Sequence, residues 1–360
     1  EDNVVPFFFE FLKHPVPDEW TDSILFSDRH AEVTAPSLTI AGWHDLLLGS
    51  DLEHFQGMRA NGGSAQAREN SRLIVGPWAH GMFLHVVGDV DFGFRSNGMF
   101  LDLKEDLTKL QLAWFDPWLT DEPLDNESAP VKLFVQGTNR WRDEDDWPPK
   151  GMQARQLFLT AEGGLAHEKQ EEGHGSTSYV YDPNDPCPTC GGNLLLPPQY
   201  VPGPVDQAPI LNRRDVLVFR SPPIEQGIDV IGPVKAVLYA ASSARDTDFM
   251  VKLCDIHPDG KTINVCDGVV RASFRNGESL EHLNPNETVR YEIDLWSTAQ
   301  HFSVGHRIGV LVTSSDFPRY DRNPNTGELA HEARSFEPAL QRIYHDQAHA
   351  SYIELPVCPG

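Results

Sequence analysis

Two side chains that could cooperate in acid–base chemistry each follow a short apolar run. Asp45 ends the sequence Gly-Trp-His-Asp, and His80 ends Gly-Pro-Trp-Ala-His. In a Ser-His-Asp hydrolase, a neutral His takes the proton of the attacking Ser, and a carboxylate on the other ring nitrogen fixes the tautomer and stabilises the imidazolium. Asp45 would orient the ring and His80 would be the general base. On residue type and spacing alone, both also fit loop caps or surface residues.

The nucleophile of such a triad is not recognisable in this sequence. In α/β-hydrolases the chain order is Ser, acid, His, and the Ser lies on a G-x-S-x-G turn. Asp45 and His80 have this order, but no G-x-S-x-G occurs in the 360 residues. We therefore expect the Ser, together with the oxyanion-hole donors, upstream or on a partner chain, and we expect this chain to be inactive by itself.

The elements around the two residues predict a β-α-β unit. Residues 37–41 and 72–76 are apolar runs typical of buried strands, and a helix with a capping box from Ser50 to Glu53 lies between them. Two strands joined in this way are parallel, and neighbouring strands lie about 4.8 Å apart. Open parallel sheets carry their chemistry at the carboxyl ends of strands, where Asp45 and His80 stand.

Beyond this unit the pattern changes from helical to β-rich. Aromatic residues 7–12 predict a short buried helix or connector, residues 101–119 a helix, and residues 121–130 a polar linker. Short apolar runs separated by Gly, Pro and Asn then predict an antiparallel sandwich or jelly roll. A Gly/Pro-rich stretch over 160–215 should wrap the surface. The predicted strands are residues 131–135, 216–219, 233–240, 249–256, 289–295 and 307–313.

Composition excludes several classes of partner. The 29 basic and 53 acidic residues give a net charge of −24, which disfavours nucleic acid and anionic membrane surfaces. No apolar run is long enough to span a bilayer. No targeting segment is recognisable, so the compartment stays open, with a soluble cytoplasmic protein favoured. Five cysteines in 360 residues do not indicate a disulfide scaffold, and Cys187-x-x-Cys190 favours a turn or a local disulfide over a redox or metal site.

Taken together, the motifs resemble the CocE/NonD family of serine hydrolases, which is related to X-Pro dipeptidyl-peptidases, α-amino-acid ester hydrolases and glutaryl-cephalosporanic acid acylases. The resembling segments follow the family's order along nearly the whole chain. They are residues 36–45 (PSLTIAGWHD), 76–80 (GPWAH), 112–119 (LAWFDPWL), 135–148 (VQGTNRWRDEDDWP), 181–192 (YDPNDPCPTCGG) and 313–327 (TSSDFPRYDRNPNTG).

This resemblance implies a fold and two catalytic residues. The family's fold implies the end of a helical cap over residues 1–30, the C-terminal part of an α/β-hydrolase domain over 31–125, and a galactose-binding-like jelly roll over 126–360. The family's motifs assign the triad acid to Asp45 and the triad base to His80. The implied substrates are small-molecule esters or amides, processed through an acyl-enzyme. No cofactor or metal is implied, and homo-oligomerisation is left open.

The residues after Asp45 suggest the character of the acyl pocket. The α-amino-acid ester hydrolases place further carboxylates there to bind the substrate ammonium, whereas this chain has leucines at positions 46–48. We therefore predict an apolar acyl pocket bordered by Leu47 and Trp78. The alternative, that the leucines only pack against the next helix, fits the pattern equally well.

Three other signals are weaker. His85 is the one rival base, but it lies beyond the predicted strand-end loop. Residues 321–332 carry an EF-hand-like spacing of oxygen ligands without the central Gly, which favours a structural loop. Because jelly rolls can be pure recognition domains, a non-catalytic binding or assembly module is the alternative function. Such a module would have no need of Asp45 and His80.

Overall fold

The two predicted strands at the start of the chain form a parallel pair. In the computed structural model, which describes residues 6–104, 106–120, 128–170 and 175–358, β1 (Leu38–His44) pairs with β2 (Arg72–Ala79). Helices α3 (Leu48–Asn61) and α4 (Ala65–Asn70) connect them. β2 is buried over seven of its eight residues, as expected of a strand in a covered parallel sheet. The predicted β-α-β unit is confirmed.

The sheet gains two more strands from beyond the predicted linker. β5 (Val131–Val135) pairs parallel with β2, and β6 (Arg140–Glu144) pairs antiparallel with β5, which gives the order β1-β2-β5-β6. The run 131–135 was predicted as a strand of the sandwich, and this assignment is wrong. A short apolar run predicts a strand, but it does not indicate which of two sheets the strand joins. The strand pairing therefore crosses the predicted domain boundary at residue 126.

Helix α3 begins earlier than its predicted capping box. Its N-cap is Leu47, without a side-chain cap, so Ser50 lies inside the first turn. The turn before the helix is held instead by the Leu47 N–H, which donates to Asp45 Oδ1 at 2.8 Å. The helix ends at Asn61, and the Gly62 N–H after it donates to the Met58 carbonyl. Leu52, Phe55 and Met58 recur at helical spacing, and all three are buried.

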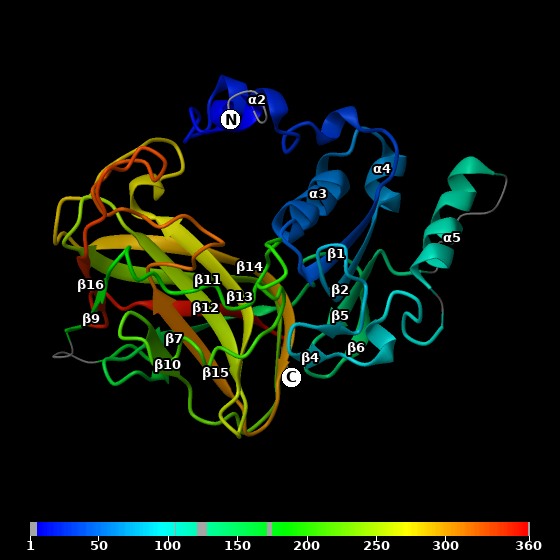
Figure 1. The fold of residues 1–360 in the computed structure, drawn as a ribbon. Coiled ribbons are helices and arrows are strands. Elements are labelled where there is room, and N and C mark those ends of the chain that lie inside the picture. Colours follow the sequence, from blue (N-terminus) through cyan, green and yellow to red (C-terminus); the bar gives the residue numbers. More distant parts are fainter. Residues whose placement is uncertain (1–5, 105, 121–127, 171–174, 359–360) are drawn as a thin grey trace.

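Two other helices differ from the prediction. Helix α5 covers Leu107–Leu119, six residues shorter than expected, because the Asp106 carboxylate caps it through the Lys109 N–H and Leu103 has a φ of 60°. It stands on the side of the α/β part away from the sandwich (Figure 1). Helices α1 (Pro6–Phe11) and α2 (Glu19–Ile24) lie at the N-terminus. The predicted helix near residues 7–12 is thus present, but it is exposed rather than buried. Of the predicted linker 121–130, residues 121–127 lie outside the described residues.

The second half of the chain folds into an antiparallel sandwich, as predicted (Figure 1). One sheet has the order β10-β15-β12-β13, with bounds Leu217–Arg220, Arg307–Thr313, Asp248–Ile256 and Thr262–Arg271. The other has the order β8-β7-β17-β11-β16-β9, with β14 on β11; its bounds are Leu165–Ala166, Gln153–Leu159, Tyr352–Val357, Ile228–Ser242, Ala339–Tyr344, Ser176–Tyr181 and Val289–Phe302.

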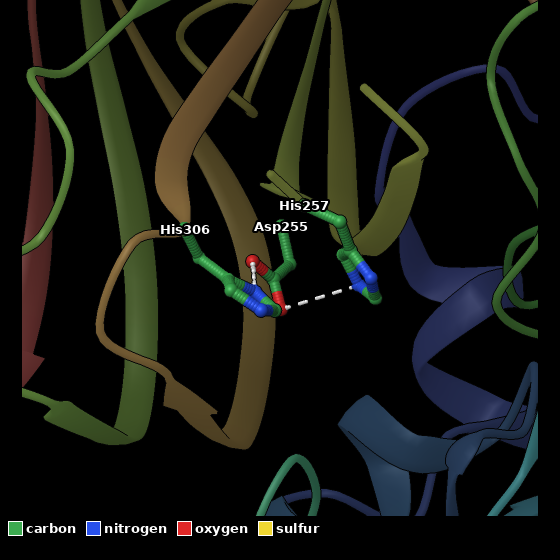
Figure 2. Close-up of side chains that lie close together, drawn as sticks. All are labelled: Asp255, His257 and His306. Atoms are coloured by element: carbon green, nitrogen blue, oxygen red, sulfur yellow. Dashed lines mark hydrogen bonds and ion pairs between the residues drawn. The ribbon is translucent and has the colours of Figure 1, made fainter. Parts of the chain in front are cut away.

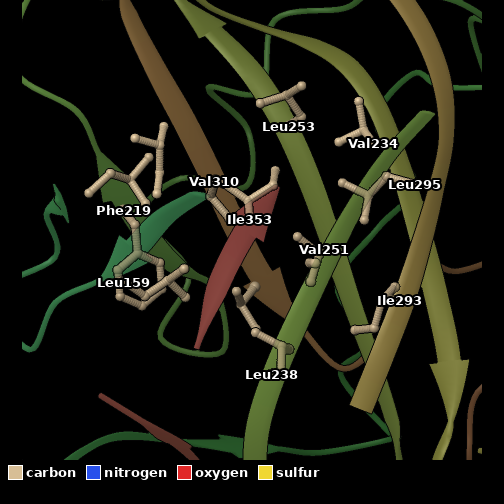
Figure 3. Packing of buried hydrophobic residues seen from close by; sticks show 14 of the residues in the cluster. Leu159, Phe219, Val234, Leu238, Val251, Leu253, Ile293, Leu295, Val310 and Ile353 are labelled. Carbon is tan, nitrogen blue, oxygen red and sulfur yellow. The ribbon is translucent and has the colours of Figure 1, made fainter. Parts of the chain in front are cut away.

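The sandwich core fills the space between the two sheets. Leu238 and Ile353 from the larger sheet face Val251 and Val310 from the smaller one (Figure 3). Burying such side chains is the main stabilising contribution of a sandwich, at roughly 25 cal/mol per Å² of apolar surface. The remaining short elements are β3 (Val86–Val87), β4 (Val90–Asp91) and three 3₁₀ turns at His30–Glu32, Phe94–Ser96 and Ala272–Phe274.

A single apolar cluster joins the α/β sheet to the sandwich. Trp43 of β1 and Trp147 lie with ring centroids 5.6 Å apart, and Ile231 and Ala299 of the sandwich belong to the same cluster. The Trp43 indole N–H donates to the Phe134 carbonyl at 2.8 Å. The two parts therefore share a continuous core. Among the described residues, no helix is both long and apolar enough to cross a membrane.

Candidate active site

The two strand ends bring Asp45 and His80 into direct contact. Asp45 follows the last residue of β1, and His80 follows the last residue of β2. The His80 Nδ1 lies 3.1 Å from each oxygen of the Asp45 carboxylate. The Asp45 side chain is mostly buried, whereas that of His80 is 37% exposed. A ring held through Nδ1 leaves Nε2 as the nitrogen that could meet a nucleophile.

The acid is fixed by its own turn and by a residue from far along the chain. The Asp45 N–H donates to the Gly42 carbonyl, and Asp45 Oδ1 accepts from Leu47. Asn193, 8% exposed, donates its side-chain amide to the Asp45 carbonyl at 2.8 Å and to the Trp43 carbonyl at 3.2 Å. The stretch 160–215, predicted to wrap the surface, thus reaches the acid's backbone. Sequence reasoning missed Asn193 because nothing local marks a contact across 148 positions.

Trp78 and two glycines hold the end of β2 in place. Trp78 is buried, and its indole N–H donates to the Ser96 carbonyl at 2.7 Å. A side chain at Gly76 would meet the Trp78 ring at 2.4 Å, and one at Gly42 would meet the Trp78 carbonyl at 2.3 Å. The glycines of both motifs therefore allow the close approach of β1, β2 and this ring.

The two residues predicted to border the acyl pocket lie in different environments. Leu47 is 46% exposed, beside the acid. Trp78 is 1% exposed and packs with Ile74, Leu101 and Leu107. Of these two residues, only Leu47 therefore offers surface to a substrate. Leu48, by contrast, packs into the apolar core. At that position the leucine therefore serves packing, as the alternative interpretation of residues 46–48 expects.

Among the described residues, no carboxylate pairs with the rival base, His85. The ring of His85 lies against Phe94, with centroids 4.6 Å apart, and its Nδ1 lies 3.3 Å from the Asn97 amide. The geometry thus favours His80. In the EF-hand-like loop, Asn323 is buried, and its side-chain amide donates to Asp246 and Asp248. Cys187 and Cys190 are buried free thiols, and burial raises the pKa of Cys187 to about 12.

Asp51 is a further acidic group near the pair that the motif analysis missed. It lies in the first turn of α3, and its pKa is raised to about 6, first because it is half-buried and second because of the Asp45 charge. His80 opposes this shift. Above pH 6, ionised Asp51 therefore adds a second negative charge to the site.

Replacing Asp51 with Asn should stabilise the protein at high pH. When folding raises the pKa of a carboxyl, the free energy of unfolding falls as the pH rises from the carboxyl's pKa in the unfolded state to its pKa in the folded state. After discounting for solvent screening at this half-buried position, we expect Asp51→Asn to raise the free energy of unfolding by about 1 kcal/mol at pH 8 and by less at pH 4. Urea unfolding at both pH values measures this, and a variant that is less stable at pH 8 than at pH 4, relative to wild type, contradicts it.

The residue before the acid is a buried neutral imidazole. His44 is 1% exposed, and its Nε2–H donates to Gln136 Oε1 at 2.8 Å. Burial lowers its pKa to about 4, against the opposing hydrogen bond to Gln136. The ring next to Asp45 is therefore uncharged at neutral pH and positions β1 against the strand end at Gln136.

His44 should make the protein acid-sensitive. The unfolded residue takes a proton near pH 6.5 and the folded one only near pH 4, so stability is present above pH 6.5 and is lost as pH falls between these values. His44→Gln should remove this contribution, of about 3 kcal/mol. The stability gap between wild type and variant should narrow by roughly this amount from pH 7 to pH 4 in urea unfolding. A gap that stays constant would show that His44 is not buried in the neutral form.

Comparison with known proteins places these features in a family. The family model described as X-Pro dipeptidyl-peptidase C-terminal non-catalytic domain matches residues 126–354, and that of the X-Pro dipeptidyl-peptidase (S15) family matches residues 1–82, which include Asp45 and His80. The chain belongs to the CocE/NonD and X-Pro dipeptidyl-peptidase S15 family. The resemblance drawn from the motifs is therefore confirmed.

Relatives in this family are hydrolases of esters and peptides. The chain is 36% identical to the cocaine esterase of Rhodococcus sp. strain MB1 Bresler over 97% of its own length and 61% of the esterase. Among solved structures, an aminopeptidase from a marine sediment Thaumarchaeota archaeon has a TM-score of 0.87 at 26% identity, over 99% of this chain and 61% of that one. An α-amino acid ester hydrolase has a TM-score of 0.86 at 25% identity, over 98% and 61%. The chain thus spans about three fifths of these relatives.

Proposed function

We propose that this chain supplies the acid and the base of a serine hydrolase that cleaves ester or amide bonds through an acyl-enzyme. The observation that carries the proposal is the contact of His80 Nδ1 with both oxygens of Asp45 at 3.1 Å. In this arrangement Asp45 holds the N–H on Nδ1, and His80 Nε2 takes the proton of a Ser hydroxyl and later returns it to the leaving group. The half-exposed ring beside a mostly buried acid fits this division of roles.

The Ser would come from elsewhere in the assembled enzyme. We propose that it lies on an upstream segment or on a partner chain, together with the oxyanion-hole donors. The chain's coverage of 61% of the cocaine esterase relative supports this. So does β1, which is at the end of the described sheet order and offers an edge for further strands. The isolated chain would then bind no acyl group covalently, and the sandwich would act as a non-catalytic partner of the site.

A labelling experiment tests this proposal. The full protein, meaning this chain with the segment or partner that carries the nucleophile, is treated with a fluorophosphonate and digested for mass spectrometry. We expect one labelled Ser outside residues 1–360, with labelling lost in His80→Ala and kept in the matched control His85→Ala. No labelled Ser, or labelling unaffected by His80→Ala, would instead favour the non-catalytic binding module.

The acyl pocket is proposed to be apolar where Leu47 borders it. Leu47 is exposed beside Asp45, within the run 46–48, where the α-amino-acid ester hydrolases are expected to carry carboxylates for the substrate ammonium. Trp78 contributes from below, by holding the strand end that carries His80. The names of two relatives point to the two alternatives: one is a cocaine esterase, and the other is an α-amino acid ester hydrolase. We therefore propose apolar or aryl acyl groups rather than charged α-amino acyl groups as substrates.

Adding a carboxylate at this position should shift the preference. In the full protein, Leu47→Asp is expected to raise kcat/KM for an α-amino ester relative to its uncharged analogue about five- to tenfold, as one added charge at a partly exposed site is worth about 1 kcal/mol. The neutral isostere Leu47→Asn is the control and should leave the ratio near the wild-type value. A wild-type enzyme that already prefers charged α-amino esters would contradict the proposal of an apolar acyl pocket.

A further inference from the structure

A second constellation of ionisable side chains lies in the sandwich, outside the Asp45–His80 pair. Asp255 is on β12, His257 follows the end of that strand, and His306 precedes β15. The two strands are antiparallel neighbours, with Ile256 opposite Arg307, so His257 and His306 stand at facing strand ends. Figure 2 shows the two imidazoles on either side of the Asp255 carboxylate.

The ligand atoms of the three residues converge. His306 Nδ1 lies 2.8 Å from Asp255 Oδ1, and His257 Nε2 lies 3.8 Å from Asp255 Oδ2. The two imidazole rings have centroids 4.4 Å apart, and one ligand atom from each residue lies within 4.8 Å of the others. We propose that Asp255, His257 and His306 form a binding site for a divalent transition-metal ion, with Zn²⁺ as the best fit.

The chemistry of the donors selects this class of metal. Two imidazoles with one carboxylate suit Zn²⁺ and its neighbours, whereas Ca²⁺ and Mg²⁺ prefer sites made of oxygens. Metal–ligand bonds of about 2.1 Å place tetrahedral ligands about 3.4 Å apart. The two His–Asp distances, 2.8 Å to Oδ1 and 3.8 Å to Oδ2, lie on either side of that value, and all three ligand atoms lie within 4.8 Å of one another, so side-chain rotations would bring them to a common ion.

A hydrogen bond between one His and the Asp does not account for the whole arrangement. It uses His306 and Asp255 but leaves His257 turned toward the same carboxylate without a normal hydrogen bond. The Asp255 side chain is only 7% exposed. A cation held by all three residues would offset the cost of burying this carboxylate.

The surroundings offer room for a fourth ligand. The cluster lines a cavity of about 210 Å³ together with Phe92 and Gln136 of the α/β part. Gln136 is 2% exposed, and its Nε2 is a buried donor without a hydrogen-bond partner in the described chain. A water or anion in the open position of a three-ligand zinc site would enter this cavity and offer that amide an acceptor. The orphaned donor is therefore a second observation that points to a ligand.

The location suggests a structural role at the junction. The Gln136 side chain accepts a hydrogen bond from His44, the neighbour of the proposed acid, through its Oε1. The same side chain also lines the cavity. Gln300 donates weakly to Asp255, at 3.5 Å, and pairs by a β-bridge with Gln136. All three ligands belong to the sandwich, so the metal would connect to the α/β sheet through a water or anion bound beside Gln136. This inference does not depend on the proposed hydrolase function.

Zinc titration of the full, chelator-stripped protein tests the site. Competition with a chromogenic zinc indicator should show one high-affinity Zn²⁺ per chain. Since loss of residues that only support metal ligands costs about 10- to 100-fold in affinity, losing a direct ligand in His257→Ala or His306→Ala should cost at least tenfold. The matched control is His349→Ala, which removes another His paired with an Asp, at 3.2 Å from Asp346. It should retain the wild-type affinity, and Ca²⁺ should not compete.

Two outcomes of the titration would overturn the proposal. One is the absence of a high-affinity zinc in wild type, and the other is an equal effect of His349→Ala and His257→Ala. His257 is 36% exposed, so His257→Ala decides the matter even if His306→Ala fails to fold. Anomalous diffraction at the zinc edge should place the ion between the three side chains, and a peak elsewhere would also overturn it. Hydrolase activity is not a readout here, so this test and the labelling test fail separately.

Discussion

Replacing His80 with alanine in the full protein is expected to lower kcat/KM for an ester substrate by roughly four to six orders of magnitude. Without the imidazole, no group near Asp45 in the described chain is placed to take the proton of the Ser hydroxyl. The residual rate should come from substrate binding and the oxyanion hole alone. Initial rates with a chromogenic ester measure the effect, over several substrate concentrations to separate kcat from KM.

The control for this experiment is His85→Ala. His85 is the other histidine close in sequence, but its contacts are Phe94 and Asn97 rather than a carboxylate. We expect it to keep kcat/KM within a few-fold of wild type. If His85→Ala loses activity and His80→Ala retains it, the assignment of the base is wrong.

Replacing Asp45 with asparagine should lower kcat by about 10⁴, with little change in KM. The amide has nearly the shape of the carboxylate and its oxygen can still accept from the Leu47 N–H, so the turn should survive. The amide nitrogen, however, can donate to His80 Nδ1 and would stabilise the tautomer that carries its proton on Nε2. That tautomer cannot take a proton from Ser, and the imidazolium loses its counter-charge.

A matched control separates this effect from a general loss of negative charge. Glu53→Gln removes a carboxylate from an exposed position of the neighbouring helix α3 and should leave kcat unchanged. A raised rate for Asp45→Asn at high pH is also expected, because hydroxide can take over part of the base's role. An Asp45→Asn enzyme with near wild-type kcat would show that Asp45 is only a turn residue.

The central part of the site was predictable because its signals are local. The apolar runs at residues 37–41 and 72–76 and the helix between them are enough to specify parallel strands, and residues just after such strands share one sheet edge. This logic brings Asp45 and His80 together without any knowledge of the remaining fold. Their contact in the structure agrees with that placement.

The parts that were not predictable depend on contacts between distant segments. β5 joins the parallel sheet although its sequence resembles that of a sandwich strand. Asn193 reaches Asp45 from a loop whose composition indicates only irregular structure. Asp255 and His306 are 51 positions apart and meet only because β12 and β15 pair. In each case the tertiary pairing decides the neighbour, and no periodic pattern encodes it.

The predicted start of helix α3 was wrong for a related reason. Residues 50–53 have the composition of a capping box, but the competing acceptor is the Asp45 side chain, which holds the turn three residues earlier. The same carboxylate also faces His80. A residue with a role in a proposed site thus displaces the ordinary local signal for the start of a helix.

A crystal structure of the full protein after reaction with a fluorophosphonate would show directly whether Asp45 and His80 serve the nucleophile. The phosphonylated Ser is expected outside residues 1–360, with its Oγ about 3 Å from His80 Nε2 and with Nδ1 of the same ring still on the Asp45 carboxylate. A labelled Ser whose Oγ lies against a different base, with the Asp45–His80 pair remote from it, would contradict the claim that this chain provides the acid and base of the site.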